Sequence, residues 1–340
     1  MQMNLRVLAI TNIYPSPERP WLGTFVEQQV IGLEAIGVKV NVLFFDRKSE
    51  GPFVYFRMAG RIQSALSQFE PHLLHVMYGG VMAGKITAVP WGRPIVVTFH
   101  GSDVLGENLS GNWRKLVSHY GVRCSWAAAR KAHGIVVVAR HLGLALPPDV
   151  DRRKVRVIPC GVDLERFQPL QRDVCRQKLG WKPDAFHVLF PANGGDAVKR
   201  PWLARAAVQA LRNQGVNVEL HLLAGVRYAE VPEWINASDV LILTSLHEGS
   251  PTVVKEALAC NVPVVSVKVG DVAERIAGID GCHLAAPEPE DLARKLLAVL
   301  DRNARIDAGP AVLALSITRV AERLMDFYGA VLDARVPGVA

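Results

Sequence analysis

The chain has 340 residues, of which 50% are hydrophobic, 21% charged and 7% aromatic. This composition is typical of a globular protein and excludes a disordered or fibrous chain, and the length suggests two domains. No run of roughly eighteen apolar residues predicts a transmembrane helix, and the first residues lack the pattern of a signal peptide. We therefore expect a cytoplasmic protein.

Five cysteines are scattered along the chain, and none forms a C-x-x-C pair. A disulfide framework or a thiolate zinc site is therefore not expected, which fits a reducing compartment. His72 and His75 have no second ligand pair at metal-site spacing, so we expect no metal.

The net charge of +7 is unevenly distributed. Residues 1–166 hold 20 Lys and Arg against 12 Asp and Glu, a balance of +8, whereas residues 167–340 hold 19 against 20, a balance of −1. A basic surface attracts phosphorylated ligands or anionic lipid, although an ordinary solvated surface accounts for the asymmetry equally well. No nucleic-acid-binding motif accompanies it, so we expect no nucleic-acid partner.

Short apolar, β-branched runs alternate with helical patterns along the whole chain. Such runs are typical of parallel strands that are buried on both faces, and the alternation favours βαβ units. Eleven strands are many for one open sheet, so we predict two doubly wound domains. The predicted strands are Arg6–Thr11, Val38–Phe45, Leu73–Tyr78, Pro94–Phe99, Ile135–Ala139, Val155–Pro159, His187–Pro191, Val218–Ala224, Val240–Ser245, Val262–Val267 and Cys282–Ala285.

The boundary between the domains is predicted within residues 158–169, where prolines and a glycine cluster and the charge balance changes. This gives a first domain over 1–166 and a second over 167–316. The remaining residues, 317–340, begin with a helical pattern over Ile317–Leu332. Ligands of open α/β sheets bind beyond the carboxyl ends of the strands, so we expect a site in a cleft between two such domains.

Two segments that follow strands in the first half carry polar groups. Gly23 and Thr24 precede an amphipathic helical stretch, and a glycine there lets an anion approach free N–H groups, although a simple turn would also explain it. His100 and Asp103 follow the strand that ends at Phe99, where the imidazole is able to bind a sugar hydroxyl or a phosphate.

Two further segments follow strands in the second half. Asn193-Gly-Gly leads to Lys199 and Arg200, two cations that are able to hold a diphosphate or are simply solvated. Glu248 and Glu256 are separated by seven residues, and the helix that carries Glu256 is predicted to begin near Pro251-Thr252. Its N–H groups would face a phosphate, while the two carboxylates would accept hydrogen bonds from hydroxyl groups.

Together these segments resemble the GT-B glycosyltransferases of the retaining, family 4 (group 1) type, over nearly the whole chain. The Glu-x7-Glu element is the most specific part of the resemblance. It is supported by Gly23-Thr24-Phe25, by Thr98–Asp103, by the linker Val157–Phe167 and by Val198-Lys199. Within that family, the chain resembles members that act in bacterial exopolysaccharide or teichuronic-acid assembly.

The resemblance implies a GT-B fold, with two Rossmann-like domains facing across a cleft and a C-terminal helix that crosses back to the first domain. It also implies a role for each motif residue. Glu248 would contact hydroxyls of the donor sugar, Glu256 the ribose, Lys199 the departing diphosphate and His100 the transferred sugar. The remaining expected donor or nucleotide contacts are Gly23, Asn193, Arg200, Gly249, Ser250, Thr252 and Val253, and the expected acceptor contacts are Thr24 and Asp103.

The chain also departs from the family pattern. An arginine that usually stands about five residues before the lysine is absent, since the loop reads Asn193-Gly-Gly. Pro251 removes one backbone donor, and Cys160 replaces an asparagine of the linker. We interpret these departures as variation within the family.

The resulting hypothesis is transfer of a sugar from a nucleotide sugar, with UDP as the expected nucleotide, to a hydroxyl of a saccharide or lipid-linked acceptor, with retention and without metal or cofactor. Alternatives are a nucleotide-sugar epimerase, a phosphorylase, or a catalytically silent nucleotide-sugar-binding module. Arg57 and Arg61, on the apolar-rich stretch Phe53–Phe69, suggest peripheral contact with an anionic membrane, although an amphipathic helix that packs on its own sheet explains them as well.

Overall fold

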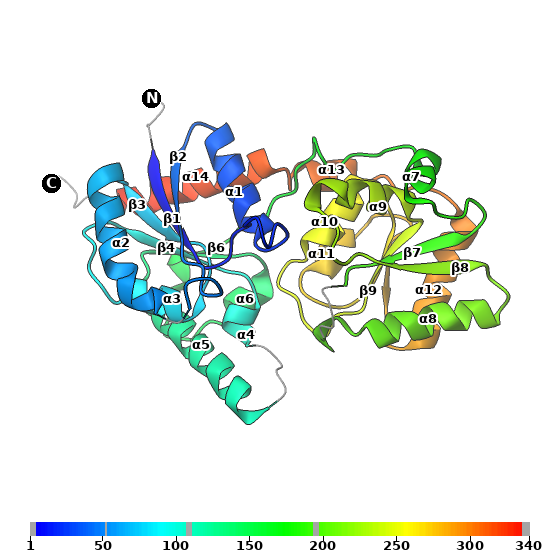
Figure 1. Cartoon of the computed structure of the whole chain (residues 1–340), viewed down its shortest axis with the longest axis horizontal. Helices are drawn as coiled ribbons and strands as arrows, with labels where there is room; N and C mark the ends of the chain where they lie inside the picture. The colour runs from blue at the N-terminus through cyan, green and yellow to red at the C-terminus, as the bar shows by residue number, and fades with distance from the viewer. Residues whose placement is uncertain (1–4, 52, 107–110, 193–196, 335–340) are drawn as a thin grey trace. The chain divides into compact units, whose positions relative to one another are not determined.

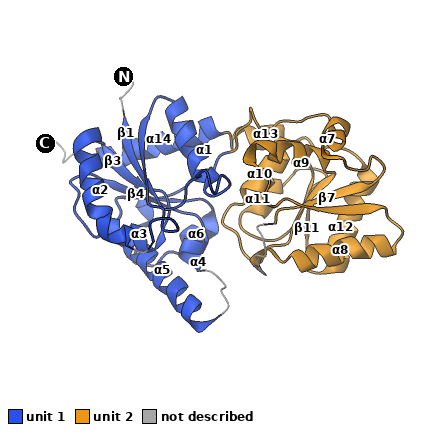
Figure 2. Cartoon of the chain, in the orientation of Figure 1, with its two compact units in different colours: residues 1–161, 317–340 blue, residues 162–316 orange. Residues whose placement is uncertain are grey.

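The computed structural model describes residues 5–51, 53–106, 111–192 and 197–334 (Figure 1). Its contacts divide the chain into two compact units, which are coloured separately in Figure 2. Unit 1 comprises residues 1–161 and 317–340, and unit 2 comprises residues 162–316. The chain thus builds most of unit 1, then unit 2, and returns to unit 1 with its last helix.

Unit 1 is built around a parallel sheet of six strands in the order β2-β1-β3-β4-β5-β6. The strands of its centre are buried almost completely, as their continuous apolar sequences require. The strands are β1 (Arg6–Thr11), β2 (Lys39–Phe44), β3 (Leu73–Val76), β4 (Ile95–Phe99), β5 (Gly134–Val137) and β6 (Val155–Val157).

Helices cover both faces of this sheet. Successive strand residues point to opposite faces, so Leu74 and Val97 join the core on one face while Leu73 and Val96 join the core under the last helix. The helical elements of unit 1 are α1 (Thr24–Ala35), α2 (Val54–Phe69), α3 (Gly80–Thr87), α4 (Ser102–Leu105), α5 (Asn112–Lys131), α6 (Arg140–Leu144), the 3-10 turn η1 (Arg152–Lys154) and α14 (Ile317–Asp333).

Unit 2 repeats this architecture with five parallel strands in the order β11-β10-β9-β7-β8. The strands are β7 (Phe186–Phe190), β8 (Val218–Leu222), β9 (Val240–Leu243), β10 (Val264–Val267) and β11 (His283–Ala285). The helical elements are α7 (Arg172–Leu179), η2 (Ala197–Lys199), α8 (Pro201–Asn213), η3 (Tyr228–Glu230), α9 (Val231–Ala237), α10 (Thr252–Ala259), α11 (Val272–Ile276), α12 (Pro289–Arg302) and α13 (Gly309–Leu313).

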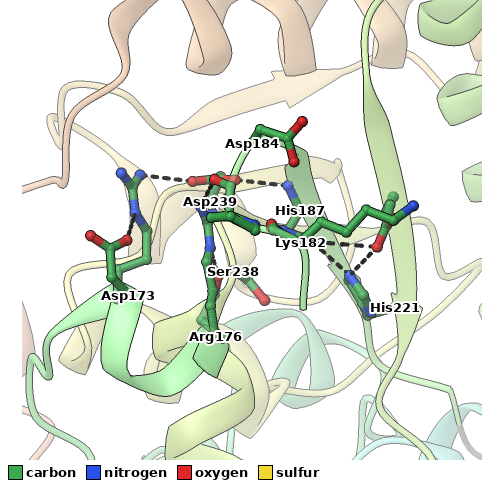
Figure 3. Close-up of polar contacts among 12 residues, drawn as sticks. Asp173, Arg176, Lys182, Asp184, His187, His221, Ser238 and Asp239 are labelled. Atoms are coloured by element: carbon green, nitrogen blue, oxygen red, sulfur yellow. Dashed lines mark hydrogen bonds and ion pairs between the residues drawn. The ribbon is translucent and has the colours of Figure 1, made fainter. Parts of the chain in front are cut away.

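The start of unit 2 is tied to its sheet by one carboxylate. Asp239 accepts hydrogen bonds from the guanidinium groups of Arg172 (2.9 Å) and Arg176 (2.6 Å), both on α7, and from the backbone N–H of His187 (2.7 Å) (Figure 3). Charge-assisted bonds of this kind are stronger than neutral ones, so they hold α7 beside β7 and β9.

All eleven predicted strands are confirmed, and so is the predicted helix at 317–332. Several strands end one or two residues earlier than predicted, for example at Val76 and Leu222, because the apolar sequence continues into the loops that follow them. Within the described residues, no helix is long and apolar enough to cross a membrane.

The last helix is fastened to unit 1 by a buried polar contact as well as by apolar packing. The phenol oxygen of Tyr328 lies 2.6 Å from Nδ1 of His75, and Nε2 of the same ring lies 2.7 Å from the hydroxyl of Thr98. Burial lowers the pKa of His75 to about 3, so the ring is neutral and serves as acceptor on one side and donor on the other. α14 thereby becomes part of the core of unit 1.

This contact predicts the effect of Tyr328→Phe. Removing the hydroxyl leaves a buried ring nitrogen without its hydrogen-bond partner, which costs about 1–3 kcal/mol of unfolding free energy. We expect a lower midpoint in thermal and urea unfolding, whereas Tyr120→Phe, at an exposed phenol of the same unit, should unfold like the wild type. Equal midpoints for the wild type and Tyr328→Phe would show that the contact contributes nothing.

Candidate functional site

A partly buried charge pair of unit 2 lies where β7 and β9 end. The ammonium group of Lys199 forms an ion pair with the carboxylate of Glu248, and the hydroxyl of Ser245 donates to the same carboxylate oxygen (2.8 Å). Both charged side chains are 16% exposed. Two residues that the sequence assigns to a diphosphate and to a sugar are therefore in contact with each other, and each remains within reach of solvent.

Neighbouring contacts join the two loops that carry this pair. The hydroxyl of Thr244 donates to the backbone oxygens of Lys199 (2.7 Å) and Arg200 (3.0 Å). The backbone N–H of Leu246 donates to the oxygen of Val198 (2.8 Å). The backbone on either side of the ion pair is thus fixed, so that Lys199 and Glu248 are held close to each other before any ligand arrives.

The guanidinium of Arg200 binds backbone oxygens in the structure, instead of pointing out as a second phosphate ligand would. Its guanidinium donates to the backbone oxygens of Thr244 (2.6 Å) and Ser245 (3.3 Å), and burial lowers its pKa. Its backbone is left-handed, with φ of 50°. In this conformation the residue stabilises the backbone at the end of β9. Its expected contact with the nucleotide stays a prediction. Asn193 lies outside the described residues.

The helix that follows Glu248 begins where the sequence predicts. Pro251 is the residue before the first turn of α10, and Thr252 is its first residue. The hydroxyl of Ser250 donates to Asp271 (2.8 Å) and accepts from the buried ammonium group of Lys255 (3.0 Å). These contacts use the Ser250 side chain to fix the helix start, and its expected contact with the nucleotide stays a prediction.

Gly249 is packed closely against a second loop of unit 2. A Cβ added to Gly270, whose φ is 56°, would lie 2.8 Å from the oxygen of Gly249 and 3.1 Å from Cβ of Glu248. Only glycine fits this position, so the loop after β10 supports the turn that carries Glu248. Thr252 and Val253 are half-buried at the start of α10.

Glu256 lies in a buried position beneath a tyrosine. The phenol of Tyr228 donates to one of its carboxylate oxygens (3.4 Å), and the residue is 6% exposed. Burial raises the pKa of Glu256 to about 7, although the charge of Lys255, the phenol and the charge of Arg166 act in the opposite direction. The group therefore changes charge close to neutral pH.

Tyr228 and Arg166 lie close to Glu256, and the sequence analysis did not single them out. The guanidinium of Arg166 lies over the Tyr228 ring, 4.9 Å from its centre, and the ring contacts Phe167. Tyr228 comes shortly after β8, so the rule that polar groups after strands form sites would have identified it. Arg166 comes from the linker, for which no such rule exists.

In unit 1, Gly23 has the left-handed backbone that its place before α1 suggests. Its φ is 77°, and an added Cβ would lie 2.7 Å from backbone atoms of Ile13. The loop after β1 therefore folds tightly onto the start of α1, where Thr24 is half-buried. Both the conformation and the close approach require glycine.

His100 is held between two aromatic rings. It stacks on Tyr78, with ring centres 5.6 Å apart, and packs against Phe25 at 4.6 Å. Its Nε2 lies 3.0 Å from the backbone oxygen of Met77, and its Nδ1 lies 3.7 Å from Sγ of Cys160. The oxygen can only accept, so Nε2 carries the proton, and the cysteine that departs from the family pattern contacts the other nitrogen.

Asp103 organises the loop rather than projecting from it. Its carboxylate is 6% exposed and accepts backbone N–H groups of Gly79 (3.0 Å), His100 (3.0 Å) and Gly101 (2.8 Å). Burial raises its pKa to about 6 despite these hydrogen bonds, which favour the charged form. The residue joins the loops after β3 and β4, and its expected contact with an acceptor stays a prediction.

One group of side chains in the described part of the chain could hold a metal ion. Ligand atoms of His187, Glu219 and His221 lie within 4.8 Å of one another, at the beginning of β7 and on β8 (Figure 3). His187 donates from Nε2 to the oxygen of Lys182 (2.7 Å), and its Nδ1 lies 2.8 Å from Nε2 of His221. A hydrogen bond between the rings satisfies both nitrogens. His187 is the second residue of β7, and His221 is the fourth of the five residues of β8.

Comparison with known proteins relates this geometry to two family models. The Glycosyltransferase Family 4 model matches residues 14–166, and the model of Glycosyl transferases group 1 matches residues 191–302. A D-inositol 3-phosphate glycosyltransferase of Pseudarthrobacter chlorophenolicus is 27% identical over 98% of this chain and 97% of its own. A putative teichuronic acid biosynthesis glycosyltransferase, TuaC of Bacillus subtilis, is 25% identical over 79% of this chain and 82% of its own.

Solved structures share the fold at low sequence identity. Sucrose-phosphate synthase from Thermosynechococcus elongatus superposes with a TM-score of 0.76 at 17% identity, covering 97% of this chain and all of that one. Anabaena HepE in complex with UDP superposes with a TM-score of 0.68 at 17% identity, covering 96% of this chain and all of that one. The predicted fold class is confirmed. The chain is a glycosyltransferase with two parallel-sheet units, and it belongs to the family 4, group 1 glycosyltransferases of the GT-B fold.

Proposed function

We propose that this glycosyltransferase takes its sugar from a UDP-sugar and transfers it, with retention of anomeric configuration, to a hydroxyl of a saccharide or lipid-linked acceptor in cell-surface glycan assembly. The observation that carries the proposal is the Lys199–Glu248 pair, which lies at strand ends of the unit that also places Glu256 on α10. The structures of HepE with UDP and with UDP-glucose, and the teichuronic acid relative, support it.

The charges of this pair suit the two ends of a sugar diphosphate. Lys199 would neutralise the diphosphate as negative charge develops on it, and the first N–H groups of α10 would face the same group. Glu248, released from Lys199, would accept hydrogen bonds from hydroxyl groups of the sugar. This arrangement supplies positive charge from the chain itself, so the proposal includes no metal.

Retention is proposed because, among the residues that the structure describes, the carboxylates around this site have other partners. Glu248 pairs with Lys199, Asp271 pairs with Arg275, and Glu256 lies buried beneath Tyr228. In the proposed step, the acceptor oxygen forms a bond to the anomeric carbon on the face from which the diphosphate departs. The acceptor proton passes to the departing phosphate oxygen, and Lys199 stabilises the charge that remains there.

One observation favours a second function, a nucleotide-sugar-binding module without turnover. Arg200 holds backbone oxygens at the end of β9, and the usual arginine before Lys199 is absent from the sequence. A single cation would then stabilise the leaving group. Binding of UDP-sugars without transfer to any of a broad panel of acceptors would favour this function, whereas an epimerase would convert the donor without an acceptor.

Substitutions at the pair test the proposed reaction. We expect Lys199→Met to lower kcat by roughly 10²–10³, because it removes fixed charge that acts on the leaving group. Glu248→Gln should lower turnover more than UDP affinity. Lys178→Met, which breaks an exposed pair with Glu233 in the same unit, is the matched control and should leave kcat unchanged.

The measurements are initial rates with UDP-sugars, calorimetric UDP affinity and the anomeric configuration of the product by NMR. Full activity of Lys199→Met would contradict the assigned role. A product with inverted configuration would contradict retention while leaving sugar transfer intact.

The buried carboxyl of Glu256 predicts a pH-dependent donor affinity. Ribose hydroxyls would donate to the charged form, and the pKa of the free protein's carboxyl is raised to about 7. Protonation therefore competes with binding, and the dissociation constant of UDP-glucose should rise about tenfold from pH 8 to pH 6. UDP-glucose is the suitable probe because its diphosphate does not titrate in this range.

The control for this prediction is Glu256→Gln. It should bind UDP-glucose weakly at every pH, with no slope between pH 6 and pH 8, because its amide does not titrate. A wild-type affinity that does not change with pH, together with unaltered binding by Glu256→Gln, would remove Glu256 from the nucleotide site.

Peripheral contact with the inner face of the cytoplasmic membrane forms the remaining part of the proposal. The excess positive charge of residues 1–166 supports it, and so does a lipid-linked acceptor. The sequence suggested Arg57 and Arg61 for this contact, but the two side chains have different surroundings in the structure. Arg61 binds Glu50 (2.9 Å) and the backbone oxygen of Phe44 (2.9 Å), whereas Arg57 is exposed.

A further inference from the structure

The first half of α5 carries a row of exposed apolar side chains. Trp113 is 75% exposed, Leu116 58%, Val117 46% and Tyr120 58%. Their spacing of three and four residues places them on one side of the helix. In Figure 1, the N-terminal end of α5 extends beyond the rest of unit 1. We call these four residues the α5 stripe.

The α5 stripe faces away from the domain that carries it. Val122 and Ser125 are the buried residues in the middle of α5, and Gly80 donates its backbone N–H to the Ser125 hydroxyl (2.7 Å). At about 100° per residue, Val122 lies roughly opposite Trp113 and Tyr120 around the helix axis. The side that packs on unit 1 and the side that carries the stripe are therefore different sides of the helix.

The charge of α5 is entirely positive. The helix holds no Asp or Glu, and its cationic residues are Arg114, Lys115, Arg123, Arg130 and Lys131. Arg114, Lys115 and Arg123 are exposed beside the stripe. An amphipathic helix with Trp and Leu on one side and cations around it is the chemistry that binds the interface of an anionic bilayer.

We propose that the α5 stripe inserts into the interface of an anionic lipid bilayer and docks unit 1 on the membrane. This inference deepens the proposed function by naming the surface and the lipid charge through which the enzyme would meet a lipid-linked acceptor. Trp113 and Tyr120 have rings suited to the headgroup region, and the flanking cations would pair with lipid phosphates.

The position of α5 relative to its sheet supports this docking. α2 and α5 both begin in the region beyond the carboxyl ends of the strands, where ligands of such sheets bind. At the start of α2, Phe53 is 71% and Phe56 79% exposed, and the ammonium group of Lys85 lies 5.6 Å from the centre of the Phe56 ring. A second aromatic and cationic patch thus accompanies the stripe at this end of unit 1.

A second copy of the chain is a less favourable occupant of the stripe. Symmetric pairing of two α5 helices would bring two sets of cations together without an intervening acidic residue from either helix, and like charges at an interface oppose association. An anionic bilayer removes this repulsion and also buries the apolar side chains.

The test is flotation of the full-length protein with vesicles of phosphatidylcholine alone or with one-third phosphatidylglycerol. We expect binding to the anionic vesicles that weakens as salt rises. The double substitution Trp113→Ser with Leu116→Ser should weaken binding by more than about tenfold, because two large apolar side chains no longer insert. Arg114→Gln with Lys115→Gln should weaken binding and reduce its salt dependence.

The matched control is Trp202→Ser, which changes a tryptophan that is 61% exposed on α8 of unit 2. It should bind vesicles like the wild type, and all variants should share the wild-type thermal midpoint. Equal binding by the Trp113/Leu116 variant and the wild type would overturn the proposal, as would absence of vesicle binding by the wild type. Loss of a dimer in the same variant would assign the stripe to a second copy.

Vesicle binding is measured without donor or acceptor, so its result is separate from that of the proposed reaction. A protein that binds vesicles through α5 but transfers no sugar would contradict the proposed function and leave the docking surface intact. Transfer to a soluble acceptor by the Trp113/Leu116 variant should proceed at the wild-type rate, since the substitutions lie on a side of α5 that faces away from unit 1.

Discussion

Both sheets are parallel and covered by helices on both faces, and this constraint determines where polar chemistry is possible. A central strand such as β4 is buried along its whole length, so its side chains are apolar or, like Thr98, fully hydrogen-bonded. Along such central strands, charges in contact with solvent are confined to the loops beyond the strand ends. The motifs around His100, Lys199 and Glu248 are therefore found at carboxyl ends, which parallel strands place along one edge of each sheet.

The charged groups at these sheet edges have different surroundings in the two units. In unit 1, the Asp103 carboxylate is buried and satisfied by backbone N–H groups, which fixes the path of the loops around His100. In unit 2, Lys199 and Glu248 neutralise each other while remaining partly exposed. A buried carboxylate with several backbone partners mainly shapes a loop, whereas a partly exposed ion pair is available to exchange its partners for a charged ligand.

The sequence predicted the strands and the start of α10 because these depend on local patterns. The strands follow from the periodicity of apolar residues. The start of α10 follows from the fixed backbone geometry of Pro251, and the turn before α1 from the left-handed backbone of Gly23. The direction of Arg200, the burial of Glu256 beneath Tyr228 and the contact between Cys160 and His100 depend on residues that are distant in the sequence. Such contacts are set by packing, so a single sequence identifies the residue but not the way its side chain points. The exposure of the α5 stripe was missed for the same reason, since a helical apolar row normally predicts burial.

The Lys199–Glu248 pair also bears on how donor recognition and catalysis would be linked in the proposed reaction. A diphosphate that attracts Lys199 removes the partner of Glu248, and a partly buried carboxylate without a partner is costly. Hydroxyl groups of the donor sugar would supply the missing partners. A donor that carries the correct sugar would therefore stabilise both halves of the separated pair, whereas a diphosphate alone would stabilise only one. Sugar recognition and leaving-group stabilisation would in this way depend on a single ion pair, which explains why the two residues are held together by the surrounding backbone contacts before the donor binds.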